Sequence, residues 1–311
     1  MIARRLILWL SLALTAPAPA WAAAADVLVV VSEEQGAYRE VVEAVRAELA
    51  RPPAQRVNLR IVAAAAFDAT AHDGVQAAVA IGTRAARTLA GSRLHAPVIA
   101  TLLPRAAFDR IAVESGRNVE GRRLTAVFLD QPPGRQLELV RIALPGTKNL
   151  GVLVGPESES LLLALQTAAA ERRIKLTTPR VADEKELYSA LQRLLADADV
   201  LLALPDPAVF NANTVPDILL ASYRQGVPVV GFSPAYVRAG AVAAVYTTPA
   251  QLGAQTGEAL RTLLTAGTLP PPQYPRYFTV STNAYVARSL NRTIDDATAL
   301  QKRLSAAERM N

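Results

Sequence analysis

The chain has 311 residues, no cysteine and a formal net charge of +6 at pH 7, and 51% of its residues are hydrophobic. This length suits two ordinary domains, each with a sizeable core. The lack of cysteine excludes disulfides, a thiol nucleophile and a lipid-anchored cysteine. The basic residues are scattered and have few aromatic neighbours, which argues against nucleic acid as a partner.

The first 22 residues have the pattern of a secretory signal peptide. Two arginines precede an apolar core at residues 6–14, which is too short to span a bilayer. Residues 20–22 fit the small-x-small cleavage pattern, so we expect cleavage after Ala22 and a periplasmic mature protein. An uncleaved anchor helix is the alternative for the same segment. No later segment is long and apolar enough to span a membrane.

In the first half of the chain, apolar runs of strand length alternate with helical patterns. Runs that are apolar throughout are typical of parallel strands covered on both faces. We interpret residues 102–104 and 114–118 as loops before the last strand of this half. The expected strands are residues 26–32, 57–62, 76–81, 96–101 and 119–129, and the expected helices are 38–50 and 83–90.

The second half repeats this pattern after a crossover that Pro132 and Pro133 indicate. Residues 148–176 form its clearest unit, a strand, a polar loop and a helix that lead into the next strand. Thr248 is the expected N-cap of a long helix. The expected helices are 136–143, 161–173, 185–195, 215–224, 249–266 and 283 onward, and the strands are 150–154, 174–177, 199–204, 227–231, 240–245 and 277–280.

This alternation predicts an α/β protein with two doubly wound halves and parallel sheets. Ligands of open α/β sheets bind outside the carboxyl ends of the strands. The loops that follow the strands are therefore where we expect functional side chains, and the two ligand edges can face each other across a cleft.

Motifs of known chemistry are missing from the chain. It contains no GxSxG, P-loop or GxGxxG motif, and His72 and His95 are far apart. A zinc site or a histidine-based catalytic pair is therefore poorly supported. Asp206 or Glu157 could act as an acid or base, but catalysis needs a second group within reach, and the sequence offers none. We expect no catalysis, no metal and no cofactor.

Polar and aromatic residues follow several of the expected strand ends. Thr83 can cap a helix whose free N–H groups suit an anion, and Arg84 can clamp a carboxylate. The alternatives are an ordinary cap with a solvated arginine, and a loop cap for Asp206. Glu157 is either a ligand contact or a favourable anion in the first turn of a helix.

The aromatic residues near these ends suit the walls of a small-ligand cleft, although packing between or within domains is the alternative for each. The candidate ligand-binding residues are Glu34, Gln35, Tyr38, Thr83, Arg84, Thr101, Glu157, Ser158, Asp206, Phe210, Phe232, Ser233, Tyr236 and Tyr246.

Several stretches of the chain resemble one known family. They are AIGTRAA at 80–86, NVEGRRL at 118–124, LPGTKNLGVLVGPESES at 144–160 and the segment 227–260, which begins VPVVGFSPAYVRAG. In this order they are similar to ABC-type solute-binding proteins related to tryptophan- and tyrosine-binding components. The resemblance runs over nearly the whole mature chain.

The resemblance implies a type I periplasmic binding fold, with two Rossmann-like lobes that three crossovers join and that close on a ligand. It implies one lobe of residues 23–130 plus 247–271 and another of residues 131–246 plus 272–311. It also implies a monomer, an ABC permease in the inner membrane as partner, and a small ligand that is amino acid-like or a carboxylate.

Two functions stay open at this point. One is a periplasmic protein that captures a solute and presents it to a permease. The other is a ligand-sensing or protein-partner module that uses the same clamp fold.

Overall fold

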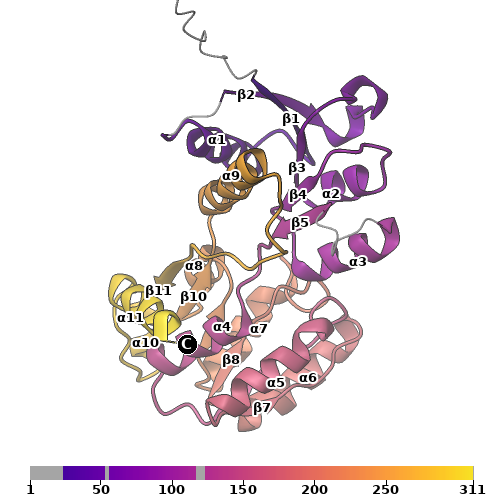
Figure 1. Cartoon of the computed structure of the whole chain (residues 1–311). Helices are drawn as coiled ribbons and strands as arrows, with labels where there is room; N and C mark the ends of the chain where they lie inside the picture. Colours follow the sequence, from indigo (N-terminus) through magenta and orange to yellow (C-terminus); the bar gives the residue numbers. More distant parts are fainter. Residues whose placement is uncertain (1–23, 53–55, 117–122, 311) are drawn as a thin grey trace, which may run out of the picture.

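The chain folds into two α/β lobes, one above the other in Figure 1. The computed structural model describes residues 24–52, 56–116 and 123–310. The predicted signal peptide, residues 1–22, and the predicted start of the fifth strand, residues 119–121, lie outside the described residues. No helix in the described ranges is long and apolar enough to cross a membrane.

The first lobe contains a five-stranded parallel sheet with the order β2-β1-β3-β4-β5. Its inner strands are apolar because helices cover both faces, and all five residues of β3 are buried. The strands are β1 (Ala25–Val31), β2 (Val57–Ala63), β3 (Ala77–Ile81), β4 (Val98–Thr101) and β5 (Leu124–Val127). The helices that follow them are α1 (Ala37–Leu49), α2 (Thr83–Ala90) and α3 (Arg105–Ser115).

The helix α9 (Pro249–Ala266) comes late in the chain but packs on α1 in the first lobe (Figure 1). Two glycines of α9 allow this close approach. A Cβ atom at Gly253 would lie 2.5 Å from the Val41 carbonyl oxygen, and one at Gly257 would lie 2.6 Å from the Glu48 Cβ. The helix begins at a capping box that Thr248 and Gln251 form, as the sequence predicted for Thr248.

The second lobe contains a six-stranded sheet with the order β11-β10-β9-β8-β6-β7. The fold class is the predicted one, with the exception that β11 runs antiparallel to β10. The strands are β6 (Asn149–Gly151), β7 (Lys175–Thr177), β8 (Val200–Leu202), β9 (Val229–Gly231), β10 (Ala243–Tyr246) and β11 (Thr279–Thr282). The helices are α4 (Pro133–Ala143), α5 (Leu162–Glu171), α6 (Glu184–Asp197), α7 (Thr214–Arg224), α8 (Pro234–Ala239), α10 (Ala284–Ser289) and α11 (Ala297–Met310).

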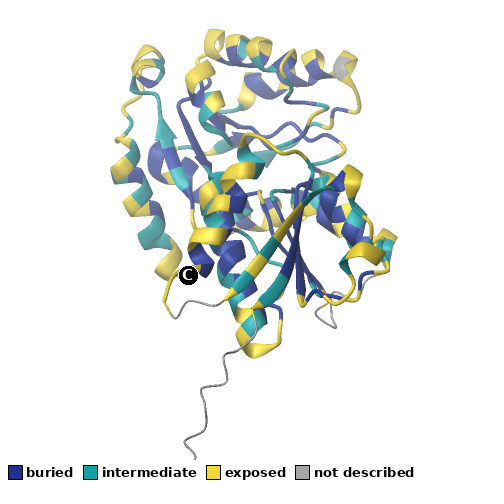
Figure 2. Cartoon of the chain, turned by 90° about the horizontal axis from the view of Figure 1, so that it is seen from above, coloured by how far each residue is buried: buried dark blue, intermediate teal, exposed yellow. Residues whose placement is uncertain are grey.

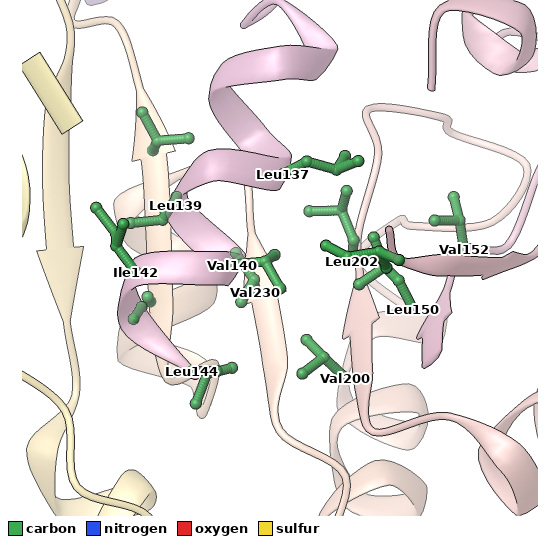
Figure 3. Packing of buried hydrophobic residues seen from close by; sticks show 14 of the residues in the cluster. Leu137, Leu139, Val140, Ile142, Leu144, Leu150, Val152, Val200, Leu202 and Val230 are labelled. Atoms are coloured by element: carbon green, nitrogen blue, oxygen red, sulfur yellow. The ribbon is translucent and has the colours of Figure 1, made fainter. Parts of the chain in front are cut away.

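Apolar side chains fill the space between the helices and the sheet in each lobe. Figure 2 shows the inner strands of the sheets as buried and the outer faces of the helices as exposed, while the edge strand β2 is intermediate to exposed. Leu137 and Val140 of α4 belong to the same buried cluster as Leu150, Leu202 and Val230 of the sheet, and Figure 3 shows part of this cluster. Each of the buried hydrophobic clusters belongs to one lobe, so each lobe has its own core.

Several elements differ from the sequence prediction. Helix α3 was not predicted, because its first residue follows Pro104, which offers no side-chain cap. The short helix α8 was also missed, although Pro234 occupies its first turn. The predicted helix from 283 onward is in fact α10 and α11, with Asn291 between them at a φ of 54°. Strand β11 lies two residues later than the strand that we predicted at 277–280.

Three segments connect the lobes: the residues between β5 and α4, those between β10 and α9, and those that precede β11. Gln273 pairs with Val127 of β5, and the Tyr274 ring lies 5.5 Å from that of Phe128. The chain therefore still contacts the first lobe just after residue 272, where we expected its return. The lobe boundaries themselves stay predictions.

Candidate functional site

The carboxyl ends of the strands in both sheets contribute to one cavity beside the crossovers, which we call the hinge cavity. Its volume is about 310 Å³. Two crossover segments and the loops after β8 and β9 line it. The lining residues are Leu129, Asp130, Gln131, Gln136, Pro205, Phe232, Ser233, Pro234, Tyr246, Thr247, Thr248 and Pro249.

The aromatic part of this wall includes two predicted residues, Phe232 and Tyr246. The Phe232 ring lies 4.5 Å from that of Tyr236 and 6.4 Å from that of Phe210. Phe210 is buried in the core, and burial raises the pKa of Tyr236 to about 12. Phe232 is therefore the member of this trio that lines the cavity, and the other two hold it in place. The Tyr246 hydroxyl is 2.9 Å from the Ser281 hydroxyl.

Asp130 is the acidic residue of the hinge cavity, and only 7% of its surface is exposed. Its Oδ2 accepts a hydrogen bond of 2.5 Å from the backbone N–H of Arg105, the first residue of α3. The carboxylate thus caps α3 from a distant part of the chain. Burial raises the pKa of Asp130 from 3.8 to about 6, although the nearby N–H groups and Arg105 act in the opposite direction.

The raised pKa of Asp130 predicts a pH-dependent stability. A carboxyl whose pKa is higher in the folded protein stabilises the fold fully below about pH 3.8, and this contribution is lost as the pH rises through about 6. The loss corresponds to about 3 kcal/mol of unfolding free energy. Because the variant Asp130→Asn cannot ionise, its stability relative to the wild type should rise by about that amount between about pH 4 and about pH 8.

Urea denaturation of both proteins at a series of pH values measures this difference. Asp109→Asn is the matched control, because Asp109 is a half-exposed acid on α3 that faces Arg105. Because this variant removes only an exposed ion pair, its stability should differ from that of the wild type by no more than about 1 kcal/mol. Parallel stability curves for Asp130→Asn and the wild type would contradict the assignment of a destabilising buried charge.

A second hollow, the lobe 1 hollow, lies at the carboxyl edge of the first sheet and has a volume of about 490 Å³. It brings together three predicted residues, Tyr38, Thr83 and Arg84. Burial raises the pKa of Tyr38, Glu33 raises it further and Arg84 lowers it. The full lining is Ser32, Glu33, Tyr38, Thr83, Arg84, Arg87, Thr88 and Leu102.

The cap of α2 corrects the prediction made for Thr83. Thr83 is the first residue of the helix, and Gly82 precedes it with a φ of 92°. The Ser32 hydroxyl, from the loop after β1, accepts the hydrogen bond from the Ala85 N–H at 2.9 Å. The capping side chain thus comes from the neighbouring strand. A Cβ at position 82 would lie 2.6 Å from that hydroxyl oxygen, so a glycine is required there.

Asp206, Ser158 and Glu157 form a network of their own in the second lobe. Asp206 is only 1% exposed, and its Oδ2 accepts hydrogen bonds from the Glu157 N–H, the Ser158 N–H and the Ser158 hydroxyl at 2.8–3.0 Å. Its Oδ1 accepts from the Ala208 N–H at 3.1 Å. These bonds support the loop-cap alternative for Asp206. Direct contact of Asp206 or Ser158 with a ligand stays a prediction.

The Glu157 side chain crosses between the lobes. Both of its carboxylate oxygens accept hydrogen bonds from the Arg110 guanidinium of α3, at 3.1 and 2.9 Å. Both side chains are about half exposed, so the pair contributes little stability in water. The ion pair nevertheless shows that α3 and the loop after β6 lie within contact distance.

The remaining predicted residues lie elsewhere. Thr101 is fully buried, and its Oγ1 has no partner among the described residues. Glu34 lines a separate hollow with Arg39 and Ile61, and Gln35 is exposed beside it. The hinge cavity thus gathers Phe232, Ser233 and Tyr246, while the structure does not bring Glu34, Gln35 or Thr101 to it.

The cavity residues that sequence reasoning missed include one acid and two amides, Asp130, Gln131 and Gln136. A usable signal was present, because Asp130 and Gln131 directly follow the fifth expected strand and precede the crossover prolines. Polar residues at a strand exit are where ligand contacts are expected in such sheets. No group of three or more His, Cys, Asp or Glu in the described part of the chain could hold a metal ion.

The family profile described as ABC transporter substrate binding protein matches residues 53–289 of the chain. The chain belongs to this family. Proteins of the family bind small-molecule ligands, work with ABC permeases and are periplasmic or extracellular. No curated protein matches the chain.

Several solved structures of substrate-binding proteins share the fold. A conserved domain protein from Vibrio cholerae is 22% identical, with 90% of this chain and 98% of that chain covered and a TM-score of 0.60. An ABC domain from Streptococcus pneumoniae, in complex with L-Trp, is 18% identical with the same coverage and a TM-score of 0.60. A ligand-free, open substrate binding protein with adhesive properties from Clostridium difficile is 18% identical, with 87% and 96% covered and a TM-score of 0.70. At these identities the likeness shows the fold, which is the type I periplasmic binding fold.

Proposed function

We propose that this substrate-binding protein captures a small organic solute between its lobes in the periplasm and delivers it to an ABC permease in the inner membrane. The hinge cavity carries the proposal, because both lobes and two crossovers line it. Its volume of about 310 Å³ lies at the lower end of the range for small-molecule sites. Membership of the family supports the transport role.

The polar groups of the first lobe can complete the site when the lobes close. Tyr38, Thr83 and Arg84 line the lobe 1 hollow at the carboxyl edge of the same sheet that leads to the hinge cavity. The guanidinium of Arg84 makes no ion pair with another residue in the described ranges, which leaves its five N–H donors for a ligand. An acidic or amino acid-like solute would use it as a bidentate partner.

The mechanism requires binding and hinge motion but no bond-making chemistry. The three connecting segments absorb the rotation of the lobes, and closure removes the solute from water. The cleaved signal peptide that the sequence predicts would place this step in the periplasm. We infer accordingly that the protein is not an enzyme.

A thermal-shift screen of the mature protein tests the proposal. The panel comprises amino acids, amines, carboxylates, nucleosides and sugars. A solute at about a hundred times its dissociation constant stabilises the folded protein by about 2.7 kcal/mol, which should raise the melting midpoint by several degrees. A well-folded protein whose midpoint does not move with any compound class would contradict solute capture and favour the ligand-sensing or protein-partner module.

A further inference from the structure

The hinge cavity contains a buried carboxylate, Asp130, that forms no ion pair with a described residue. The Asp130 carboxylate accepts from the backbone N–H of Arg105 at Oδ2, and no side chain in the described ranges donates to its Oδ1. A buried carboxylate is costly unless it is paired with a positive group. The structure keeps this carboxylate in a cavity wall, where a ligand can reach it.

The cationic side chains near Asp130 are committed to other partners. The Arg105 guanidinium donates to the Tyr274 hydroxyl at 3.1 Å and to Asp109 at 3.4 Å. The Arg135 guanidinium binds Gln131 Oε1 and the Pro275 carbonyl, each at 2.8 Å, and it also pairs with Glu308 on α11. Neither arginine forms an ion pair with Asp130, so the missing positive charge has to come from outside the described chain.

A second polar group faces the same space. Gln136 lines the hinge cavity and is only 4% exposed, yet its carboxamide forms no hydrogen bond with another described residue. In contrast, both polar atoms of the Gln131 carboxamide have partners. Its Nε2 donates to the Thr247 hydroxyl at 2.7 Å, and its Oε1 accepts from the Arg135 guanidinium. Asp130 and Gln136 therefore offer two acceptor oxygens without donors, beside the aromatic residues Phe232 and Tyr246.

We propose that the hinge cavity binds the cationic end of the solute, an organic ammonium group that donates to Asp130 and Gln136 and packs beside Phe232 and Tyr246. This inference rests on the proposed function and narrows its substrate class. An ammonium group has N–H donors for both oxygens and supplies the missing charge. Aromatic faces attract cations further. An anion or a neutral polyol would leave the carboxylate unpaired.

Calorimetric titration with matched pairs of probes tests the inference. Each pair consists of a cation and a neutral compound of similar shape. The pairs are phenethylamine with phenethyl alcohol, and putrescine with butanediol. Choline and hydrocinnamate are added as a quaternary cation and an anion. We expect at least one cation to bind the wild type at least about tenfold more tightly than its neutral or anionic counterpart, the effect of one charged hydrogen bond.

Asp130→Asn should lose this preference, because the variant keeps the shape of the cavity and removes only the charge. Asp109→Asn, the same change on the outer side of α3, should bind the cation as the wild type does. For the wild type, cation affinity should also fall when the pH is lowered from about 7.5 to about 5, as the carboxyl becomes protonated. The charged groups that act on Asp130 are Arg105 and Asp109.

The outcomes separate the inference from the proposed function. A carboxylate or sugar that binds the wild type while every cation fails overturns the inference and leaves solute capture intact. Cation binding that Asp130→Asn does not weaken also overturns it. If no compound of any class binds the folded protein, the proposed function fails, and the inference fails with it.

Discussion

Replacement of Arg135 with alanine is expected to lower the free energy of unfolding by about 2–5 kcal/mol, because two buried acceptors would each lose a charged donor, at about 1–3 kcal/mol per group. Arg135 is 7% exposed, and its guanidinium lies 4.3 Å from the centre of the Phe278 ring. Its guanidinium donates hydrogen bonds to Gln131 in the first crossover, to the Pro275 carbonyl in the third crossover and to Glu308 on α11. The variant would leave these acceptors without their donor.

The same substitution should also loosen the hinge. Gln131, which Arg135 holds at Oε1, donates to the Thr247 hydroxyl of the second crossover, and that hydroxyl donates to the Tyr277 carbonyl at 2.8 Å. One guanidinium therefore joins, directly or through Gln131, all three segments between the lobes. Urea denaturation measures the loss of stability.

Arg180→Ala is the matched control for this prediction. Arg180 is also in the second lobe, but its side chain is 71% exposed and pairs with the exposed Glu159. Its removal should leave the free energy of unfolding close to that of the wild type. Equal losses for the two variants would show that the buried network around Arg135 contributes nothing beyond a surface pair.

Asp206→Ala is expected to have an effect of similar size, about 3–5 kcal/mol. The carboxylate accepts four hydrogen bonds, three from Glu157 and Ser158 at Oδ2 and one from Ala208 at Oδ1. Alanine would leave the Glu157 and Ala208 N–H groups without an acceptor among the described residues. As a donor, Ser158 would keep only its longer bonds to the Gly155 carbonyl. The loop after β6 should lose its order, because a Cβ at Gly155 would lie only 2.5 Å from Asp206 Oδ2 and the loop is built around that carboxylate.

Chemical denaturation of Asp206→Ala beside Asp217→Ala checks this prediction. Asp217 is an exposed acid in the first turn of α7, so its loss should change stability by no more than about 1 kcal/mol. A small loss for Asp206→Ala, comparable with that of the surface variant, would mean that the loop finds other acceptors. It would also reopen a ligand-contact role for Asp206.

Most strands and helices could be predicted from the sequence, because the buried residues of each element form a local pattern of apolar positions. Five successive apolar residues at 77–81 are recognisable as a covered strand, and β3 has those bounds. The start of α3 could not be recognised in this way. Its cap, Asp130, lies twenty-five positions after Arg105 in the chain, so no local pattern contains it.

The candidate site was predicted less completely, for a physical reason. Phe232 and Tyr246 stood out because the chain has few aromatic residues and several of them follow expected strand ends. Asp130 and Gln136 did not stand out, since polar residues beside two prolines look like an ordinary linker. Both are buried in the folded chain, and single-sequence periodicity contains no information on such tertiary contacts.

The most direct test of a clamp that binds between its lobes is a calorimetric titration of the best stabilising compound from the screen into four proteins. These are the wild type, Arg84→Ala from the first lobe, Phe232→Ala from the second and Leu163→Ala, an exposed control on α5. We predict saturable binding of one solute to the wild type and the control, and affinities at least about tenfold weaker for both cleft variants. Wild-type affinity in both cleft variants would contradict a site shared by the two lobes.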